Sequence, residues 1–521
     1  MRFGWQPLFG FFSILLITSL LQAQDVQQDS LLAAQVLDEV VVSGRIAEPY
    51  SKRSKTIQVI SAAELKASGV VHVVDYLQRI VGLDVRRRGV GPTQADFNFR
   101  GGSFDQTLLL IDGIALEDAQ TGHHTMNMAL PMDVIERIEI IKGPAARVFG
   151  QNAFTGAVNI VTKKEITTGG TAQIGAGSYS QLQGGLSLSK RNENGGIFTH
   201  FSTISSDGYR YNTDFKNHTA YIKASVAENK KLPVQVLAFF SGRKFGANGF
   251  YASPEAKDQY EETQTSVIAV SKVFDSEKTT ITPRVYWKRN QDMYLFLRHD
   301  PDYFRNLHIS NNYGIEGNME LRSRAGKTGI GVDISRDFLA SNNLGNHNRT
   351  SITGFLEHRF EFSEGKFDIT PGVAVSYFSD FDTKAFPGLD MGYRVSDAVK
   401  FYGNIGYTYR VPTFTDLYYN GPTTQGNPDL EPESALSEEI GIKVTLNAIN
   451  FELAFFNRAS DNLIDWTKEN EADKWQTQNF SEVVTQGFDF SANYNFILGT
   501  KPQRINVGYS FIDDEIKDVG V

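Results

Sequence analysis

The chain has 521 residues, 41% of them hydrophobic, with 46 Gly, 37 Phe, 21 Tyr and no Cys, and its formal charge is -9. The modest charge and the lack of long blocks of like charge argue against a nucleic-acid-binding surface, and zero Cys excludes disulfides, thiol catalysis and cysteine metal sites. Beyond the N-terminus no apolar run approaches the roughly 18 residues of a spanning helix, which excludes a helical membrane bundle, whereas abundant Gly and aromatic residues are compatible with a β-barrel.

The N-terminus has the pattern of an export signal. Arg2 precedes an apolar run at residues 8–21, and Ala23 is the small residue expected at a cleavage site. We expect a signal peptide at residues 1–23, because the run is short for a membrane anchor and no stop-transfer flank follows. The chain then carries a short β-prone peptide made of Asp38, Glu39, Val40, Val41, Val42 and Ser43. Such a peptide can add to a partner's sheet edge, or else form an edge strand of its own protein.

Residues 51–164 predict a small α/β unit. Residues 56–60 alternate like a strand, and Ser61 with Glu64 forms a capping box that starts a helix. A second short helix is expected at 73–80 and further strands at 82–85, 96–100 and 107–112. Two polar stretches, 86–95 and 117–128, predict loops. The last segment of the unit is 135–164. It begins with a predicted strand of β-branched residues that ends at Gly143-Pro144, and a stretch rich in small residues then leads to a second predicted strand at 158–162.

From residue 171 onward the hydrophobic pattern has period two. The alternation is clear at 219–226, 367–377 and 504–511, and these runs suit the roughly 9 to 11 residues of a tilted membrane strand. Short polar turns alternate with other connections, most of which are long, such as 244–262 and 411–434. This sorting of loops by length is typical of an outer-membrane β-barrel, and a soluble sandwich has no reason to show it.

Several motifs resemble one family in its own order. They are RGG at 100–102, LLLIDG at 108–113, the stretch IERIEIIKGPAARVFGQNAFTGAVNIVTKK at 135–164, and the stretch at 409–441 with Arg410, Pro412, GNP at 426–428 and EPE at 431–433. Together they resemble the plug and barrel of TonB-dependent outer-membrane transporters, closest in layout to the vitamin B12 and ferric-siderophore receptor branch.

The resemblance implies a mainly β fold, a transmembrane antiparallel barrel of the 22-stranded type with an N-terminal α/β plug in its lumen. It places a periplasmic segment with the TonB box at 24–50, the plug at 51–164 and the barrel at 170–521. About seventeen strands can be counted, and the last residues lack the terminal aromatic of the family. We therefore expect a C-terminally incomplete chain, since an unclosed sheet would leave unpaired backbone groups in lipid.

The resemblance also implies where the working residues lie. Asp38 to Ser43 would be the box that contacts TonB, and Arg100 and Arg137, joined by Glu136, would form a latch between plug and barrel. The two plug loops would meet the substrate, through the candidates Arg87, Gln94, His123, His124 and Asn127. Imidazole suits a metal-bearing ligand, although adjacent histidines in a polar loop are more often only solvated. Asp207 and Asp214 are calcium candidates, but two acids fall short of a cage of 6 to 8 oxygens.

The sequence thus predicts TonB-dependent import of a scarce nutrient, cobalamin or a ferric siderophore or haem, after export to the outer membrane of a Gram-negative cell. Cobalamin is favoured because no extra domain separates the signal peptide from the box. The alternative is a passive porin or adhesin without energy coupling. No cofactor and no enzymatic activity are expected, because HExxH, Walker A and GxSxG motifs are missing. The expected partners are TonB with its inner-membrane complex, outer-membrane lipid, a small metal chelate and optionally a surface lipoprotein.

Overall fold

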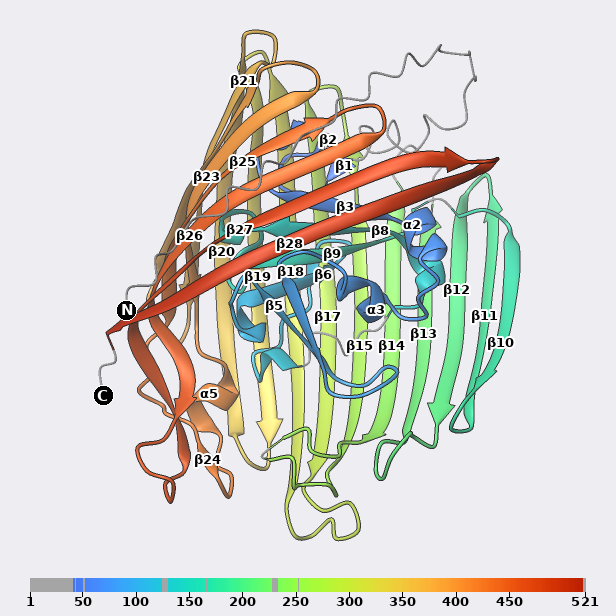
Figure 1. The fold of residues 1–521 in the computed structure, drawn as a ribbon, viewed down its shortest axis with the longest axis vertical. Helices are drawn as coiled ribbons and strands as arrows, with labels where there is room; N and C mark the ends of the chain where they lie inside the picture. Colours follow the sequence, from blue (N-terminus) through green and yellow to red (C-terminus); the bar gives the residue numbers. More distant parts are fainter. Residues whose placement is uncertain are drawn as a thin grey trace, which may run out of the picture.

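The computed structural model describes residues 41–42, 44–49, 52–123, 130–164, 166–226, 233–251 and 253–518. The expected signal peptide lies outside these ranges. The described chain forms a small α/β unit enclosed by a large curved antiparallel sheet (Figure 1). None of the helices in this part of the chain is long and apolar enough to cross a membrane.

The α/β unit, here called the plug, is built on a five-stranded sheet in the order β3-β8-β9-β6-β7. Its β6 and β9 are parallel, and the other neighbours are antiparallel. The plug elements are β3 (Ile57–Ser61), α2 (Ala62–Ala67), α3 (Val73–Leu77), β4 (Leu83–Arg87), β5 (Ala95–Phe99), η2 (Phe104–Gln106), β6 (Thr107–Ile111), β7 (Ile114–Ala115), η4 (Met132–Val134), β8 (Ile135–Lys142), α4 (Ala146–Phe149) and β9 (Gly156–Thr162).

Local signals in the sequence explain most of these elements. Ser61 caps α2 by accepting a hydrogen bond from the backbone N–H of Glu64 at 3.2 Å, as the capping-box pattern predicts. The predicted loop at 86–95 was wrong at its start, because Arg86 and Arg87 pair with Asp96 and Ala95 of β5 and thereby extend β4. The predicted helix at 73–80 ends earlier, with Gln78 as its C-cap residue.

The large sheet has 19 strands in the order β10 to β28, two of which, β16 and β24, have only two residues. Its long strands are β10 (Gly169–Gly177), β11 (Gln181–Asn192), β12 (Gly195–Ser206), β13 (Phe215–Val226), β14 (Val234–Gly246), β15 (Tyr260–Lys272), β17 (Thr279–Leu295), β18 (Arg305–Ser323), β19 (Gly326–Ser341), β20 (Gly345–Phe362), β21 (Phe367–Phe378), β22 (Lys384–Arg394), β23 (Val399–Arg410), β25 (Glu433–Thr445), β26 (Ile449–Thr467), β27 (Trp475–Leu498) and β28 (Lys501–Asp518). The two short ones are β16 (Phe274–Asp275) and β24 (Thr424–Gln425). The predicted mainly β, plug-and-barrel fold is confirmed, and in the described residues the sheet is open between β10 and β28.

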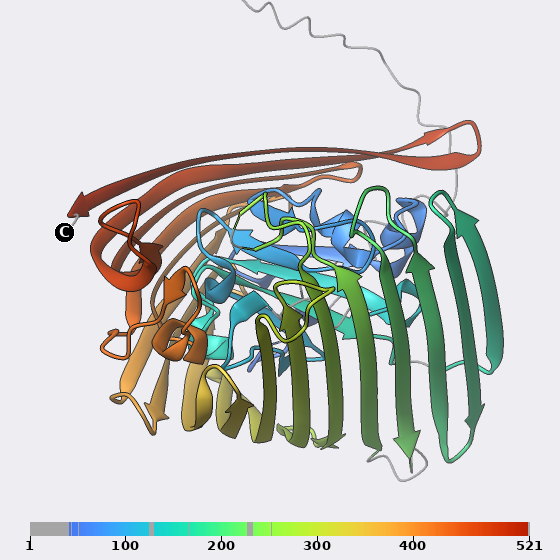
Figure 2. The same cartoon turned by 90° about the horizontal axis from the view of Figure 1, so that it is seen from below.

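The period-two pattern sorts side chains between the two faces of this sheet. On β13, Ile222 and Val226 point away from the plug and are exposed, whereas Tyr221 and Lys223 are buried on its inner side. Figure 2 shows the sheet curving around the plug, with β26 to β28 reaching across it. The apolar core of the plug continues onto the inner wall of the sheet, where Tyr221 and Phe239 join the same buried cluster.

The two ends of the barrel differ. The turns at 324–325 and 363–366 lie at one end, here called the short-turn end, and the long segment at 411–433 with α5 (Phe414–Tyr418) and β24 lies at the other, the long-loop end (Figure 1). The N-terminal hairpin of β1 (Val41–Val42) and β2 (Glu48–Pro49) lies near the short-turn end. There the backbone N–H of Ala47 donates to Glu320 at 2.7 Å, and Lys327 donates to the Ala47 carbonyl at 3.1 Å.

Candidate functional site

A polar and aromatic cluster, here called the apical cluster, occupies the plug surface that faces the long-loop end. Its members are Gln94, Asp96, Phe104, His123 and Tyr251. Gln94 and Asp96 come from the loop before β5 and from the start of β5, Phe104 begins η2, and His123 follows β7 in the plug, whereas Tyr251 comes from the connection between β14 and β15. The Tyr251 hydroxyl donates to Gln94, and the amide of Gln94 lies 2.9 Å from His123 Nδ1. Plug and barrel therefore share one surface there.

His123 is the centre of the apical cluster. Its ring stacks on Phe104 with centroids 3.9 Å apart, and its Nδ1 lies 2.9 Å from a carboxylate oxygen of Asp96. Burial alone would lower the pKa of His123, but the Asp96 carboxylate beside it raises the pKa above its ordinary value. The side chain is 30% exposed, so a ligand can reach it. The arrangement holds an imidazole in place in front of the long loops.

Asp105 fixes the backbone that carries His123. The N–H of Gly122 donates to Asp105 at 2.7 Å, and a Cβ at Gly122 would clash with that carboxylate, so a glycine is required for this approach. Burial raises the pKa of Asp105 to about 6, although Arg410 nearby opposes the shift. Helix α5 is joined to the same loop, because the N–H groups of Phe414 and Thr415 donate to the carbonyls of Ala119 and Gln120 at 2.7 and 3.0 Å.

The long connections around the cluster are tied to one another by Arg298. Its guanidinium binds both carboxylate oxygens of Asp214, at 2.6 and 3.0 Å, and the backbone N–H of Arg298 donates to the carbonyl of Asp258 at 2.8 Å. The same guanidinium lies over the ring of Tyr260, 4.4 Å from its centroid. Three connections thus form one ordered rim.

The calcium candidates lie in this rim. Asp214 is engaged by Arg298, and Asp207 is an exposed residue whose N–H donates to the Tyr179 carbonyl at 3.0 Å. Across the described ranges, no group of three or more His, Asp or Glu side chains is arranged to hold a metal ion. The geometry therefore adds nothing to the prediction of calcium at Asp207 and Asp214.

A buried ion-pair network, here called the latch, joins the plug to the barrel. Arg100 is 3% exposed and lies 2.7 Å from Glu439 on β25 and 2.9 Å from Asp489 on β27. A third ion pair of the latch joins Lys142 of β8 to Asp489 at 3.3 Å. The guanidinium of Arg100 also lies 4.3 Å from the ring centroid of Phe456. Arg100 also has a positive φ of 45°, which is uncommon outside glycine. Buried charges are tolerated when paired, and here the pairs bridge two domains.

The other predicted latch residues are placed differently. Arg137 pairs with Glu136 at 2.6 Å and with Glu139 at 2.8 Å, and all three belong to β8 of the plug. Glu136 therefore does join Arg137, but these ion pairs lie inside the plug. Their common strand puts them within reach of each other, whereas Arg100 sits at the turn after β5 and faces the barrel wall.

The remaining predicted residues have these positions. Arg87 forms an ion pair with Asp75 and donates to the Gly91 carbonyl at 3.0 Å, which makes it part of the plug's own loop structure. Val41 and Val42 form β1, paired with Pro49 and Glu48 of β2. Six residues lie outside the described ranges, namely Asp38, Glu39, Val40, Ser43, His124 and Asn127.

Sequence reasoning missed several members of both sites. Tyr251, Asp96, Lys142 and Asp489 were not singled out, because their roles depend on contacts with residues distant in sequence. Glu439 could have been found from the sequence, because alternate residues of a strand share one face. On β25 it lies on the same inward face as Glu433 and Ser437, which are both buried. Buried acids at alternate strand positions indicate a lumen-facing charged patch.

Both the plug and the large sheet match models of known protein families. The plug domain model of TonB-dependent receptors matches residues 51–157, and the model described as TonB dependent receptor-like, beta-barrel, matches residues 163–521. Among curated proteins, the vitamin B12 transporter BtuB of Vibrio vulnificus is 23% identical over 516 residues, which cover 93% of this chain and 78% of that protein.

Solved structures show the same fold at low identity. The siderophore receptor PirA of Pseudomonas aeruginosa superposes with a TM-score of 0.72 at 17% identity, covering 88% of this chain and 86% of that one. The hemophore receptor HasR of Serratia marcescens, solved as a double mutant with its hemophore HasA and heme, gives a TM-score of 0.74 at 16% identity, covering 88% and 82%.

Proposed function

The chain belongs to the TonB-dependent receptor family, whose members are outer-membrane receptors rather than enzymes, and from this premise we propose that it imports a metal chelate, with cobalamin as the first candidate. The observation that carries the proposal is the plug inside the barrel, tied to two strands by Arg100. A passive porin or adhesin needs neither a plug nor a latch. Cobalamin is favoured by the similarity to BtuB along 93% of this chain.

In the proposed mechanism, the cargo binds to the apical cluster at the long-loop end. His123 is a partly exposed group of this cluster, with Phe104 stacked on its imidazole, and the Tyr251 hydroxyl is hydrogen-bonded to Gln94 and Glu261 beside it. TonB pulls on residues 38–43 from the periplasm, at the end where β1 and β2 lie. Tension then breaks the latch, and the cargo passes the plug.

A ferric siderophore or haem is the second candidate cargo. Imidazole and phenol oxygen are common ligands of iron, and the rings of His123 and Tyr251 lie 6.5 Å apart. The similarity of the fold to PirA and HasR agrees with this cargo without preferring it to cobalamin, because folds do not fix cargo.

Uptake of labelled cobalamin, a ferric siderophore and haem, in source cells with and without this gene, tests the cargo. Selective loss of cobalamin uptake supports the first candidate, and selective loss of iron or haem uptake supports the second. Deleting residues 38–42 tests the energy coupling. The variant without residues 38–42 should bind cargo as before but no longer import it. The activity of a passive porin or adhesin would not change on this deletion.

A further inference from the structure

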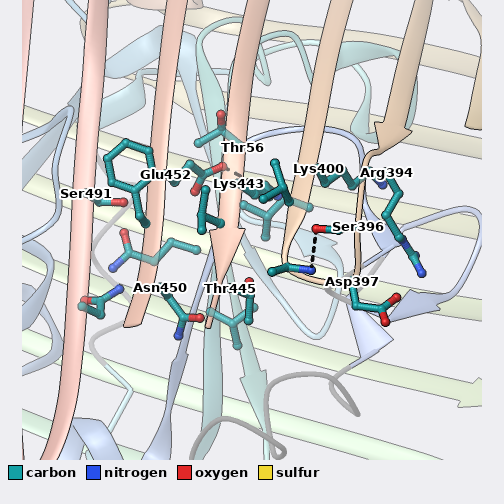
Figure 3. Close-up of a pocket in the computed structure, with 18 of the residues that line it drawn as sticks. Thr56, Arg394, Ser396, Asp397, Lys400, Lys443, Thr445, Asn450, Glu452 and Ser491 are labelled. Carbon is teal, nitrogen blue, oxygen red and sulfur yellow. Dashed lines mark hydrogen bonds and ion pairs between the residues drawn. The ribbon is translucent and has the colours of Figure 1, made fainter. Parts of the chain in front are cut away.

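A cavity of about 310 Å³ lies at the short-turn end, between the plug and the barrel wall. One side is Thr56 and the start of β3 in the plug, as far as Val59, and the other comprises barrel strands from β22 to β28 with the turns after Arg394 and Thr445. Figure 3 shows Lys400, Lys443 and Glu452 around Thr56, with Arg394 and Asp397 at one side. In the described plug sheet β3 is an edge strand that pairs with β8 on one side, so the wall on the plug side is the easier one to move.

Cationic side chains of the barrel, namely Lys400 and Lys443 of the cavity wall and Arg359 of β20, bind backbone carbonyls of the plug. Lys400 donates to the carbonyl of Lys52 at 2.8 Å, and Arg359 donates to the same carbonyl at 3.0 Å. Lys443 donates to the carbonyl of Lys55 at 2.7 Å. The plug segment 52–55 therefore provides neutral acceptors for three barrel cations.

The same segment leads directly to the latch. Thr56, its next residue, donates through its hydroxyl to Glu439 at 2.8 Å, and Glu439 is a partner of Arg100. The segment also lies between β2 and β3, on the N-terminal side of the plug, where the proposed tension acts. A pull that draws residues 52–56 away would remove the Thr56 hydrogen bond from Glu439 of the latch and the carbonyls from the lysines in one movement.

The cations left behind on the wall keep carboxylate partners. Lys400 and Arg359 each lie 3.1 Å from Asp368, and Arg359 also lies 3.1 Å from Glu361. Lys443 lies 3.7 Å from Glu452. Arg394 lines the cavity without an ion pair to any described residue, and Asn450 adds an amide. Once the carbonyls leave, Lys400 and Lys443 each lose an acceptor and offer N–H donors in a confined space, which suits anionic oxygens.

We propose that the cavity is an exit subsite for an anionic group of the cargo, such as a phosphate, carboxylate or catecholate oxygen. Its lysines, Lys400 and Lys443, are masked in the resting receptor by the carbonyls of Lys52 and Lys55. The subsite rests on the proposed import function and extends it to the periplasmic half of the path. The subsite binds the anionic group only after the segment 52–56 is withdrawn. The open plug therefore exposes the subsite to the cargo, and the resting receptor does not hold cargo there.

The test compares Lys400→Gln plus Lys443→Gln with a matched control, Lys223→Gln. Lys223 also donates to a plug carbonyl, that of Thr162 at 3.3 Å, but it belongs to β13 and lies outside the cavity. The probes are labelled cobalamin, with one phosphodiester, and a ferric tris-catecholate, with three negative charges. Binding is measured in cells without energy coupling, and uptake in coupled cells, both at equal receptor abundance.

The double variant should bind each imported probe as the wild type does but import it about tenfold more slowly, the factor expected for one charge-assisted hydrogen bond. Lys400→Arg plus Lys443→Arg should restore uptake, and Lys223→Gln should not slow it. Uptake that stays equal or rises in the double variant would overturn the subsite, because it would mean that the lysines only hold the plug in place. A wild type that imports neither probe would overturn both proposals.

Discussion

Replacing Arg100 by Gln should loosen the plug inside an intact barrel. Arg100 is 3% exposed, and its partners Glu439 and Asp489 are 1% and 5% exposed, so removing the cation leaves two buried carboxylates. Breaking a buried pair by removing one partner costs about 3 to 5 kcal/mol. Two features put the expected cost near the lower value of about 3 kcal/mol. Lys142 still reaches Asp489 at 3.3 Å, and Thr56 still donates to Glu439 at 2.8 Å.

A loss of about 3 kcal/mol corresponds to more than a hundredfold rise in the population of plug molecules that have opened locally. The assay is native-state hydrogen exchange of the purified receptor, read at the amides of β3, which pair with β8 in the plug. These amides should exchange about a hundredfold faster in Arg100→Gln, while the long barrel strands keep their protection.

The matched control is Arg86→Gln. Arg86 is also a plug arginine in an ion pair, with Asp84 at 2.8 Å, but both side chains are more than half exposed. Exposed pairs contribute about 0 to 1 kcal/mol, so exchange at β3 should stay within a few-fold of the wild type. If the β3 amides of Arg100→Gln and Arg86→Gln exchange at the same rate, the latch does not hold the plug.

Further predictions concern the long-loop end. His123→Ala combined with His124→Ala should weaken cargo binding without lowering receptor abundance, and unchanged affinity would mean that the imidazoles are only solvated. Because the pKa of His123 is raised and that of Asp96 is lowered, their contact should persist from about pH 4 to 6.5 and be lost as pH rises through the folded-state pKa of His123. Titration of the His123 imidazole by NMR checks this, and Asp96→Asn should bring that pKa down. Removing calcium with a chelator should leave cargo affinity unchanged, since Arg298 already engages Asp214, and a fall in affinity would contradict that view. Arg298→Gln should speed proteolysis of the connection at 207–214 only a few-fold, because both charges of the ion pair are partly exposed. The increase should be larger at low salt, where the ion pair is screened less.

Local and periodic patterns determined much of this protein. The alternation of apolar and polar residues predicted the barrel strands, because a strand between lipid and lumen must present opposite chemistry on successive residues. The Ser61 and Glu64 capping box predicted the start of α2, since that signal is complete within four residues. The spaced motifs of the plug were sufficient to indicate the family, which the family models confirm.

Other expectations depended on geometry that no pattern contains. Arg100 and Arg137 both lie in plug motifs and were both predicted to contact the barrel. In the structure Arg100 pairs with the barrel, whereas the ion pairs of Arg137 with Glu136 and Glu139 lie within β8. Which arginine crosses to the wall depends on the turn that carries it and on the rotation of the plug in the lumen. Both follow from packing of the whole plug against the sheet.

The sequence by itself therefore determined the architecture and the class of protein, because strand periodicity, caps and turn residues act over a few neighbouring positions. Only the tertiary structure decided which charges meet. Arg100 and Asp489 are 389 residues apart, and Lys443 and Lys55 are 388 apart. Such pairs form when the curved sheet wraps around the plug, and the energy of a buried charge depends on the partner and the burial that this packing supplies.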